Sequence, residues 1–154
     1  MRRLLIVAAL VVAGCGGGQA AVAPTVEIVV PDPTPEPVIG SGIVTFGTAY
    51  DPDTLLITKP LTTFKLKTKT IAWSASFSEP AGATSIEMIL ASVSKTGAET
   101  VLIQTPTSVS SPEFDLLANK ADLVTLVGGK AGTYVLRYLR GSTILAEGTF
   151  TLTK

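Results

Sequence analysis

The chain has 154 residues, of which 46% are hydrophobic, and its 12 basic and 12 acidic side chains leave a formal net charge of zero. That balance gives no reason to expect nucleic acid or an anionic surface as a partner. The chain contains no histidine and a single cysteine, Cys15, which excludes Ser-His-Asp and Cys-His catalysis, zinc sites built from those residues, and an internal disulfide.

The first fifteen residues predict an exported protein. Arg2 and Arg3 precede an apolar run over 4–13, and this order of charged and apolar residues is typical of an export signal. The run is far shorter than the roughly 20 residues that a helix needs to cross a bilayer. It ends on Val12-Ala13-Gly14-Cys15, which resembles the lipobox of bacterial lipoproteins.

The lipoprotein resemblance implies a chemistry for Cys15. In that family the cysteine thiol receives a diacylglyceryl group, a peptidase cuts just before it, and acyl chains such as palmitate hold the protein on the membrane. Buried acyl chains contribute about 0.8 kcal/mol per methylene, so the tether is effectively permanent. The alternative is an ordinary secretory signal that ends on a chance cysteine. We expect residues 1–14 to be a signal peptide and the mature protein to be anchored in the bacterial cell envelope, periplasmic or extracellular.

Residues 15–42 predict a tether rich in glycine and proline. Gly16-Gly17-Gly18 opens it, and prolines recur through the rest, at Pro24, Pro31, Pro33, Pro35 and Pro37. Proline favours extended polyproline II and excludes helix. At about 3.1 Å per residue, 24–37 would hold a domain roughly 40 Å from the membrane. A proline-rich ligand for a partner is the alternative to a spacer.

Residues 43–154 predict a single all-β domain, because short alternating stretches are separated by turn-forming clusters. The predicted strands are 43–50, 55–58, 63–69, 70–78, 85–93, 99–104, 113–116, 132–139 and 143–151. We expect a loop at 105–111, and we expect Asn119 to cap one or two helical turns over 120–126. Strands at this spacing indicate a two-layer antiparallel β-sandwich.

The clearest alternation lies in 70–78. One face is apolar and is predicted to enter the core: Ile71, Trp73, Ala75 and Phe77. The other face carries small or hydroxylated residues and is predicted to point outward: Ala72, Ser74 and Ser76. This period of two is typical of a half-buried strand.

The segment 131–136 resembles the approach to strand F of immunoglobulin-like domains. In those domains a corner tyrosine stands two residues before a cysteine; here Tyr134 and Leu136 occupy these positions. The resemblance implies an immunoglobulin-like antiparallel β-sandwich, with Trp73 as a loose counterpart of the core tryptophan. Lys130 replaces the aspartate usual in that motif, and the disulfide is absent.

Parity predicts the register of the last two strands. Tyr134, Leu136 and Tyr138 share a core face with Ile144 and Ala146 only if opposed residue numbers sum to an even value. A three-residue turn ending on Gly141 satisfies this condition. It places Tyr138 opposite Ser142, Leu136 opposite Ile144, and Tyr134 opposite Ala146. We also expect Gly141 to be more constrained than Gly97.

Two charged patterns are candidate sites. Asp51 and Asp53 are spaced to bind calcium from a loop, although a turn is the interpretation we favour. Lys65, Lys67 and Lys69 would form a basic row on a strand. Such a row either grips an anionic cell-wall polymer or, as we favour, protects an edge strand from pairing with another chain. No metal or other cofactor is expected.

The remaining candidates are aromatic and acidic side chains. Most aromatic residues share faces with apolar neighbours and are expected in the core: Phe46, Tyr50, Trp73, Phe77, Tyr134, Tyr138 and Phe150. Phe64 and Phe114 are left open, so no aromatic platform for sugars is evident. The acids are scattered singly, without the facing pair that glycoside hydrolysis needs: Glu79, Glu87, Glu99, Glu113, Asp115, Asp122 and Glu147.

Together these observations predict a lipoprotein that presents a non-catalytic β-sandwich in the bacterial envelope. Its membrane contact would be the lipid on Cys15, and its further partner a protein or a cell-wall polymer. The alternatives are a lipoprotein that binds a sugar or peptide for a transport or sensory system, and a small immunoglobulin-like protease inhibitor. An interaction module should expose an apolar patch or an open strand edge, whereas a ligand-binding protein should carry a pocket with convergent polar groups.

Overall fold

The computed structural model describes residues 38, 39 and 42–154. The predicted signal peptide, Cys15 and most of the predicted tether therefore lie outside the described residues. Within the described part, no helix is long and apolar enough to span a membrane.

The domain consists of strands with one short helix among the described residues, as predicted for an all-β fold. The strands are β1 Val38–Ile39, β2 Ile43–Gly47, β3 Thr63–Lys65, β4 Thr70–Ser76, β5 Ser85–Val93, β6 Glu99–Ser108, β7 Leu116–Asp122, β8 Gly132–Arg140 and β9 Thr143–Thr153. The helix is α1, Leu123–Val127.

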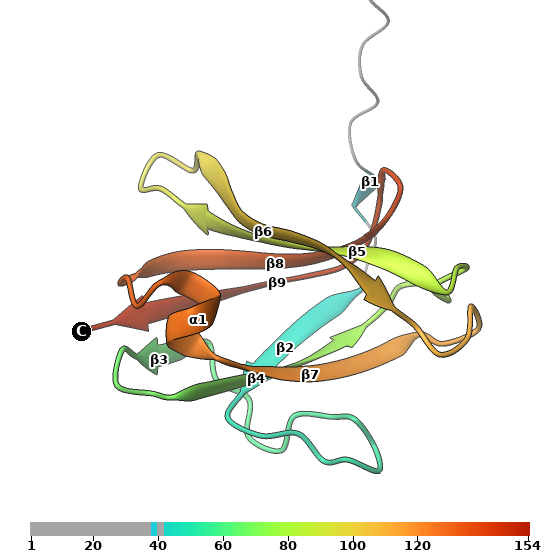
Figure 1. Cartoon of the computed structure of the whole chain (residues 1–154), viewed down its shortest axis with the longest axis horizontal. Coiled ribbons are helices and arrows are strands. Elements are labelled where there is room, and N and C mark those ends of the chain that lie inside the picture. The colour runs from blue at the N-terminus through green and yellow to red at the C-terminus, as the bar shows by residue number, and fades with distance from the viewer. Residues whose placement is uncertain (1–37, 40–41) are drawn as a thin grey trace, which may run out of the picture. The chain divides into compact units, whose positions relative to one another are not determined.

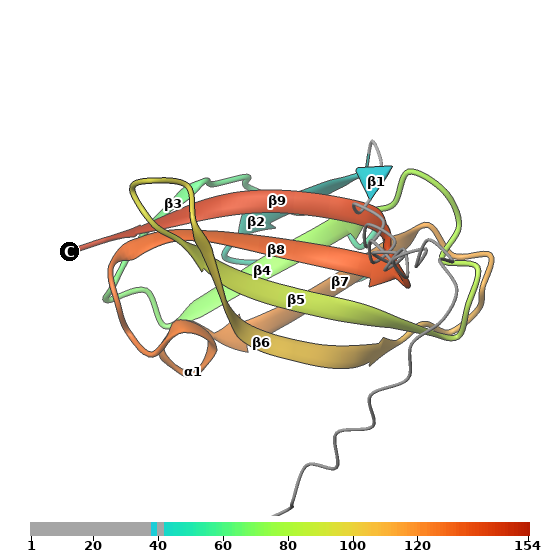
Figure 2. The same ribbon diagram turned by 90° about the horizontal axis from the view of Figure 1, so that it is seen from above.

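The strands form two layers that face each other (Figures 1 and 2). One layer has the order β6-β5-β8-β9 and the other the order β2-β4-β7. Strand β9 joins them at one side, where Ile43 pairs with Glu147 and β1 and β3 pair with β9 in parallel. A hydrogen bond crosses the interior: Trp73 Nε1 on β4 donates to the Tyr138 hydroxyl oxygen on β8 at 2.8 Å. The predicted two layers are present, but the pairing is not antiparallel throughout, because β1, β2 and β3 pair with β9 in parallel.

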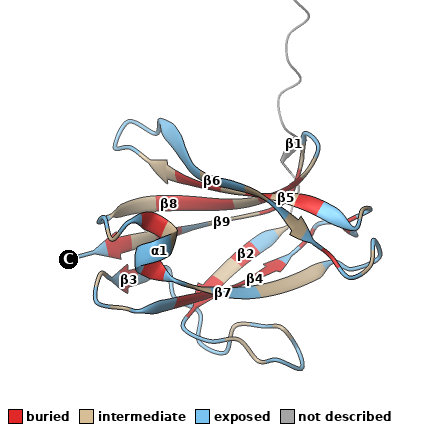
Figure 3. Cartoon of the chain, viewed as in Figure 1, coloured by how far each residue is buried: buried red, intermediate tan, exposed pale blue. Residues whose placement is uncertain are grey.

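The core lies between the layers and follows the predicted alternation (Figure 3). On β4, Ile71, Trp73 and Ala75 are buried, and the alternate residues of β5 and β8 meet them from the other layer. Aromatic rings cluster around Phe150 of β9. The centroid of its ring lies 4.9 Å from that of Phe46 and 5.3 Å from that of Tyr134, on which it stacks. The period of two thus places the large apolar side chains in a single interior.

The corner geometry of the immunoglobulin resemblance is present. The Tyr134 hydroxyl donates to the backbone carbonyl of Lys130 at 2.7 Å, and burial raises the pKa of that hydroxyl. Because the acceptor is a main-chain oxygen, lysine serves as well as aspartate at position 130. The tryptophan correspondence is wrong: Trp73 lies in β4, whereas the immunoglobulin tryptophan belongs to strand C in the layer of strand F. Trp73 reaches the core from the opposite layer.

The predicted helix cap is wrong. Asn119 lies inside β7 and pairs with Trp73, so the strand continues where a helix start was expected. Asp122 caps the helix instead, and its carboxylate accepts from the Thr125 amide at 2.8 Å. Both residues are good caps, and only the pairing of β7 with β4 decides between them.

Strand β6 is longer than predicted and includes residues expected to form a loop. It extends to Ser108 and contains Pro106, which pairs with Glu87. Proline is tolerated there because β6 pairs on one side only, so no amide is needed on the other. A bulge between its pairings with Leu90 and Ala91 leaves Leu102 as an extra residue. The bulge and the proline both blunt this edge against pairing with another chain.

The predicted register of the last hairpin is wrong. The turn has two residues, Gly141 and Ser142, and a bulge follows at Leu145. Because Leu145 is one extra residue in β9, opposed residue numbers sum to an even value beyond it, so the bulge in the strand does what a three-residue turn was predicted to do. The observed pairs are Tyr138 with Ala146, Leu136 with Gly148, and Tyr134 with Phe150. Tyr138 is nevertheless fully buried, so its predicted place in the core is confirmed.

The glycine comparison and the lysine row also need correction. Gly97 and Gly141 both have positive φ, 85° and 59°, so Gly97 is no freer of constraint than Gly141. Strand β3 ends at Lys65, and Lys67 lies in the turn that follows. The predicted strand row of three lysines therefore does not form.

Candidate functional site

The loop between β2 and β3, residues 48–62, covers the outer face of β2 and β4. Ala72 and Ser74 point away from the core, as predicted, yet they are buried. Gly47 shows how closely the loop approaches: a Cβ built on it would lie 2.5 Å from Ile57 Cγ2. Only glycine fits at such a distance. The outer face of this layer is therefore covered here, in contrast to the half-buried strand that the sequence predicted.

Asp51 organises this loop through a local turn. Its carboxylate oxygen Oδ1 accepts from the amides of Asp53 at 2.8 Å and Thr54 at 3.1 Å, and the Thr54 and Asp53 amides hold the pKa of the carboxyl below its usual value. The Asp51 backbone closes the loop with two hydrogen bonds: its amide donates to the Leu56 carbonyl, and its carbonyl accepts from the Leu55 amide. The turn interpretation of Asp51 and Asp53 is confirmed. No group of three potential metal ligands occurs within residues 42–154.

Leu55 carries a strained backbone at the tip of this turn. It has φ 59° and is the one non-glycine residue with positive φ in the described part of the chain. A side chain in this region costs on the order of 1 kcal/mol, and such strain gathers at functional sites. The turn closed by Asp51 maintains it and sets Leu55 and Leu56 on the surface.

An apolar surface surrounds that strained turn. Ile43, Leu56 and Phe114 are exposed by 61%, 54% and 48%. Leu56 shares one groove with Ile43 and Ile57, and Leu55 shares another with Phe114. The two grooves adjoin, because Ser74 and Ser76 of the first pair with Ala118 and Leu116 of the second. We call this surface, made of Ile43, Leu55, Leu56 and Phe114, the loop face.

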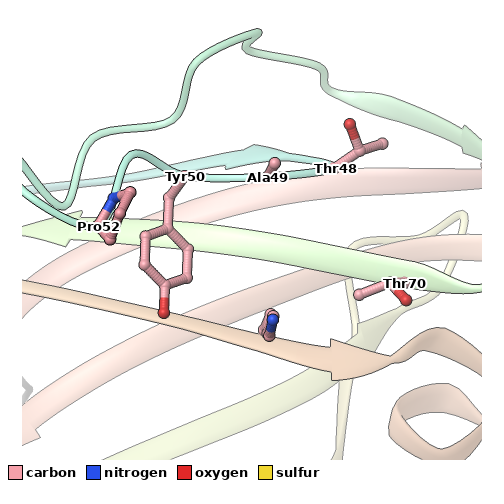
Figure 4. Close-up of a pocket in the computed structure, with 6 residues that line it drawn as sticks. Thr48, Ala49, Tyr50, Pro52 and Thr70 are labelled. Carbon is pink, nitrogen blue, oxygen red and sulfur yellow. The ribbon is translucent and has the colours of Figure 1, made fainter.

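A hollow of about 470 Å³, more apolar than polar in its lining surface, adjoins the loop face (Figure 4). Its lining combines an aromatic ring, hydroxyls and one cation: Thr48, Ala49, Tyr50, Pro52, Thr70 and Lys120. Tyr50 was expected in the core, and that prediction is wrong. Strand β2 ends at Gly47, so its alternation does not extend to Tyr50. Tyr50 is half-buried and forms an isolated antiparallel β-bridge with Ile57. The other expected core aromatics are buried, as is Phe64.

Two of the scattered acids converge on one arginine. Arg137 on β8 binds Glu99 through Nη2 at 2.8 Å and also contacts Glu147 through Nε. These contacts lower the pKa of Glu99 and raise that of Arg137. The strand register puts Ala91 and Val135 beneath the arginine, which accounts for their burial on an outer face. Acids tied to a cation in this way fasten the sheet and are not a free acid–base pair.

Sequence reasoning missed the loop face and the hollow. Their residues come from the irregular loop, from β2, β4 and β7, and from the segment before β7. One signal was available: Leu55 and Leu56 follow an Asp-Pro-Asp turn cluster, although only Leu56 is exposed and Leu55 is half-buried.

Comparisons with known proteins add little beyond shape. No protein-family model matches the chain, and the comparison with curated proteins finds no match. Among solved structures, an immunoglobulin-like protein from Pseudomonas aeruginosa is similar with 14% identity and a TM-score of 0.47, covering 71% of this chain and 91% of that one. A Pseudomonas fluorescens alkylpurine DNA glycosylase bound to DNA has 14% identity and a TM-score of 0.39, covering 75% of this chain and 31% of that one. The fold description therefore rests on the strand order, the core and the Tyr134 corner.

Proposed function

We propose that the protein is a lipoprotein that presents a non-catalytic, immunoglobulin-like interaction module in the bacterial envelope. Support for the anchor is the order of residues 1–15: a charged start, a short apolar run, and Cys15 after Ala13-Gly14. Cys15 would carry the diacylglyceryl group, and the lipid would be the protein's contact with the membrane. The domain would then stand on the envelope at the end of the proline-rich tether.

The observation that carries the interaction proposal is the loop face. Ile43, Leu56 and Phe114 are all large, apolar and about half exposed or more, and they surround a turn strained at Leu55. Contiguous exposed apolar side chains mark interaction sites on soluble domains. The partner proposed is a protein with an apolar patch of its own, since the four side chains that make up this surface are all apolar. The absence of histidine from the chain supports a role without catalysis.

Photo-crosslinking in native membranes tests this proposal. A photoreactive amino acid at position 56 should give a discrete adduct with one partner. The matched control is position 124 on α1, because Val124 is exposed by 55% and Leu56 by 54%. Adducts of equal yield at both positions, or none at position 56, would reject the loop face as a binding surface.

The anchor is tested separately. Cys15→Ser should move the protein from the membrane fraction to the soluble fraction, or leave an uncleaved precursor, and should abolish labelling by radioactive palmitate. A free, unmodified Cys15 thiol in the mature protein contradicts the anchor and leaves the interaction proposal standing.

The hollow favours a second candidate function, the binding of a sugar or peptide ligand. Tyr50 offers a ring and a hydroxyl, Thr70 a hydroxyl, and Lys120 a cation in one concave surface. Such convergent polar groups are the mark of a ligand site. Titration with a cell-wall disaccharide-peptide should then shift the Thr48 and Lys120 amide resonances and leave those of α1 unchanged. No shift at saturating ligand excludes this function.

A further inference from the structure

A third groove lies between β6 and α1. Figure 1 shows α1 in front of β8, beside β7 and below the β5–β6 hairpin. The groove has a volume of about 490 Å³, which is within the range of small-molecule sites. Its apolar lining comes from β6 and α1: Leu102, Ile103, Leu126 and Val127. None of these residues belongs to the loop face or to the hollow lined by Tyr50 and Lys120.

The floor of this groove is the edge of the hydrophobic core. Val127 and Tyr134 are buried members of the core cluster, and Ile103 and Leu126 pack against that cluster. An apolar group that enters the groove would therefore continue the core and be removed from water. Burial of apolar area contributes about 25 cal/mol per Å², which makes such a group the natural occupant.

The bulge in β6 supplies the outer wall. Leu102 is the extra residue of that bulge, and it lines the groove although 43% of it is exposed. Bulges change the direction of a side chain and often lie beside functional sites. Here the bulge presents a leucine to an open groove, where a regular strand would pair it with β5.

The rim carries one cation, on a residue whose backbone is held in place. Lys130 lines the groove, and its backbone carbonyl is held by the Tyr134 hydroxyl. Lys130 forms no ion pair with any carboxylate of residues 42–154, where the ion pairs involve Arg137 and Arg140. The Thr100 hydroxyl lies on the same rim, as does Ser92, whose hydroxyl donates to the Thr100 backbone carbonyl. The groove thus combines an apolar floor with a cation that has no carboxylate partner among residues 42–154 and with the Thr100 hydroxyl.

We propose that this groove binds one molecule of an aliphatic carboxylate, such as a free fatty acid. The chain lies on Leu102, Ile103 and Leu126, and the carboxylate lies at Lys130. Charge complementarity selects the carboxylate over a neutral or cationic head group, and the apolar floor selects an aliphatic chain over a polar ligand. This site is independent of the loop face, so both can be occupied at once.

Titration of the purified full chain with decanoate, decanol and decyltrimethylammonium tests the proposal. Decanoate should bind with one-to-one stoichiometry and shift the Thr100, Leu102 and Lys130 amide resonances. Lys130→Gln should weaken decanoate binding about fivefold, as expected for a surface ion pair, and leave decanol binding unchanged. Leu102→Asp should abolish binding, whereas Val124→Asp should not, since Val124 is exposed by 55% but lies outside the groove lining.

Each variant is first checked for folding by the emission of Trp73, the one tryptophan of the chain. Equal affinity for all three amphiphiles, or equal loss on Lys130→Gln for decanoate and decanol, would overturn the carboxylate assignment. Binding to phosphatidylglycerol vesicles without binding to decanoate would mean that the groove meets a membrane surface, which also overturns it. If Leu102→Asp fails to fold, Leu102→Ser serves in its place, and unchanged decanoate binding by that variant rejects the groove.

Discussion

Removal of the Tyr138 hydroxyl is the sharpest test of the core. Trp73 Nε1 donates to this hydroxyl at 2.8 Å, and 2% of Trp73 and none of Tyr138 is exposed. Tyr138→Phe leaves the ring in place, so it creates almost no cavity. It does leave a buried indole N–H without its acceptor, which costs about 1–3 kcal/mol. The free energy of unfolding should fall by that amount.

Urea denaturation followed by Trp73 fluorescence measures the loss directly. In thermal unfolding, a domain of this size loses about 4 °C of Tm per kcal/mol, so the Tm of Tyr138→Phe should be lower by roughly 4–12 °C. The control is Tyr50→Phe, which removes the same atom from a half-buried side chain outside the core and should change stability by less than about 0.5 kcal/mol. Equal effects of the two variants would refute the buried hydrogen bond between the layers.

Three further predictions follow from the same structure. Burial raises the pKa of Tyr138 to about 12, above the ordinary value near 10, so the unfolded chain releases this proton first. The free energy of unfolding should be unaffected below pH 10 and should fall by up to about 3 kcal/mol as the pH rises to 12. Urea titrations across this range should show the fall, and Tyr138→Phe should reduce it. Asp122→Ala should lower Tm through loss of the α1 cap, whereas Asp122→Asn should retain most of the stability. Gly47→Val should displace the 48–62 loop, since its Cβ would meet Ile57; limited proteolysis should then cut that loop faster while Trp73 emission stays unchanged.

The sequence by itself determined the core residues of the regular strands, although not the place of Tyr50, which lies beyond the end of β2. Alternation on β4, β5 and β8 is a local property: successive side chains point to opposite faces whatever the strand pairs with. Trp73, Leu90 and Tyr138 could therefore be assigned to the interior from residue type and spacing alone. The corner tyrosine was also readable, since Tyr134 and its acceptor Lys130 lie close together in the chain.

The sequence by itself did not determine where the strands end or how they are registered against one another. The bulges at Leu102 and Leu145 insert one residue each, and a bulge depends on the partner strand as much as on its own sequence. The choice between Asn119 and Asp122 as helix cap follows from how far β7 pairs with β4. The bulges and the helix cap both depend on contacts between segments distant in sequence, and local propensity does not predict such contacts.

The candidate surfaces were decided by the tertiary structure. Glu99 and Glu147 meet at Arg137 only because β6, β5, β8 and β9 lie in that order in one layer. Leu56 is exposed next to Ile43 because the 48–62 loop folds back over β2 and β4, and Lys130 joins Leu102 because α1 lies beside β6. A surface of this kind combines side chains from several segments, and its chemistry exists only once packing has brought those segments together.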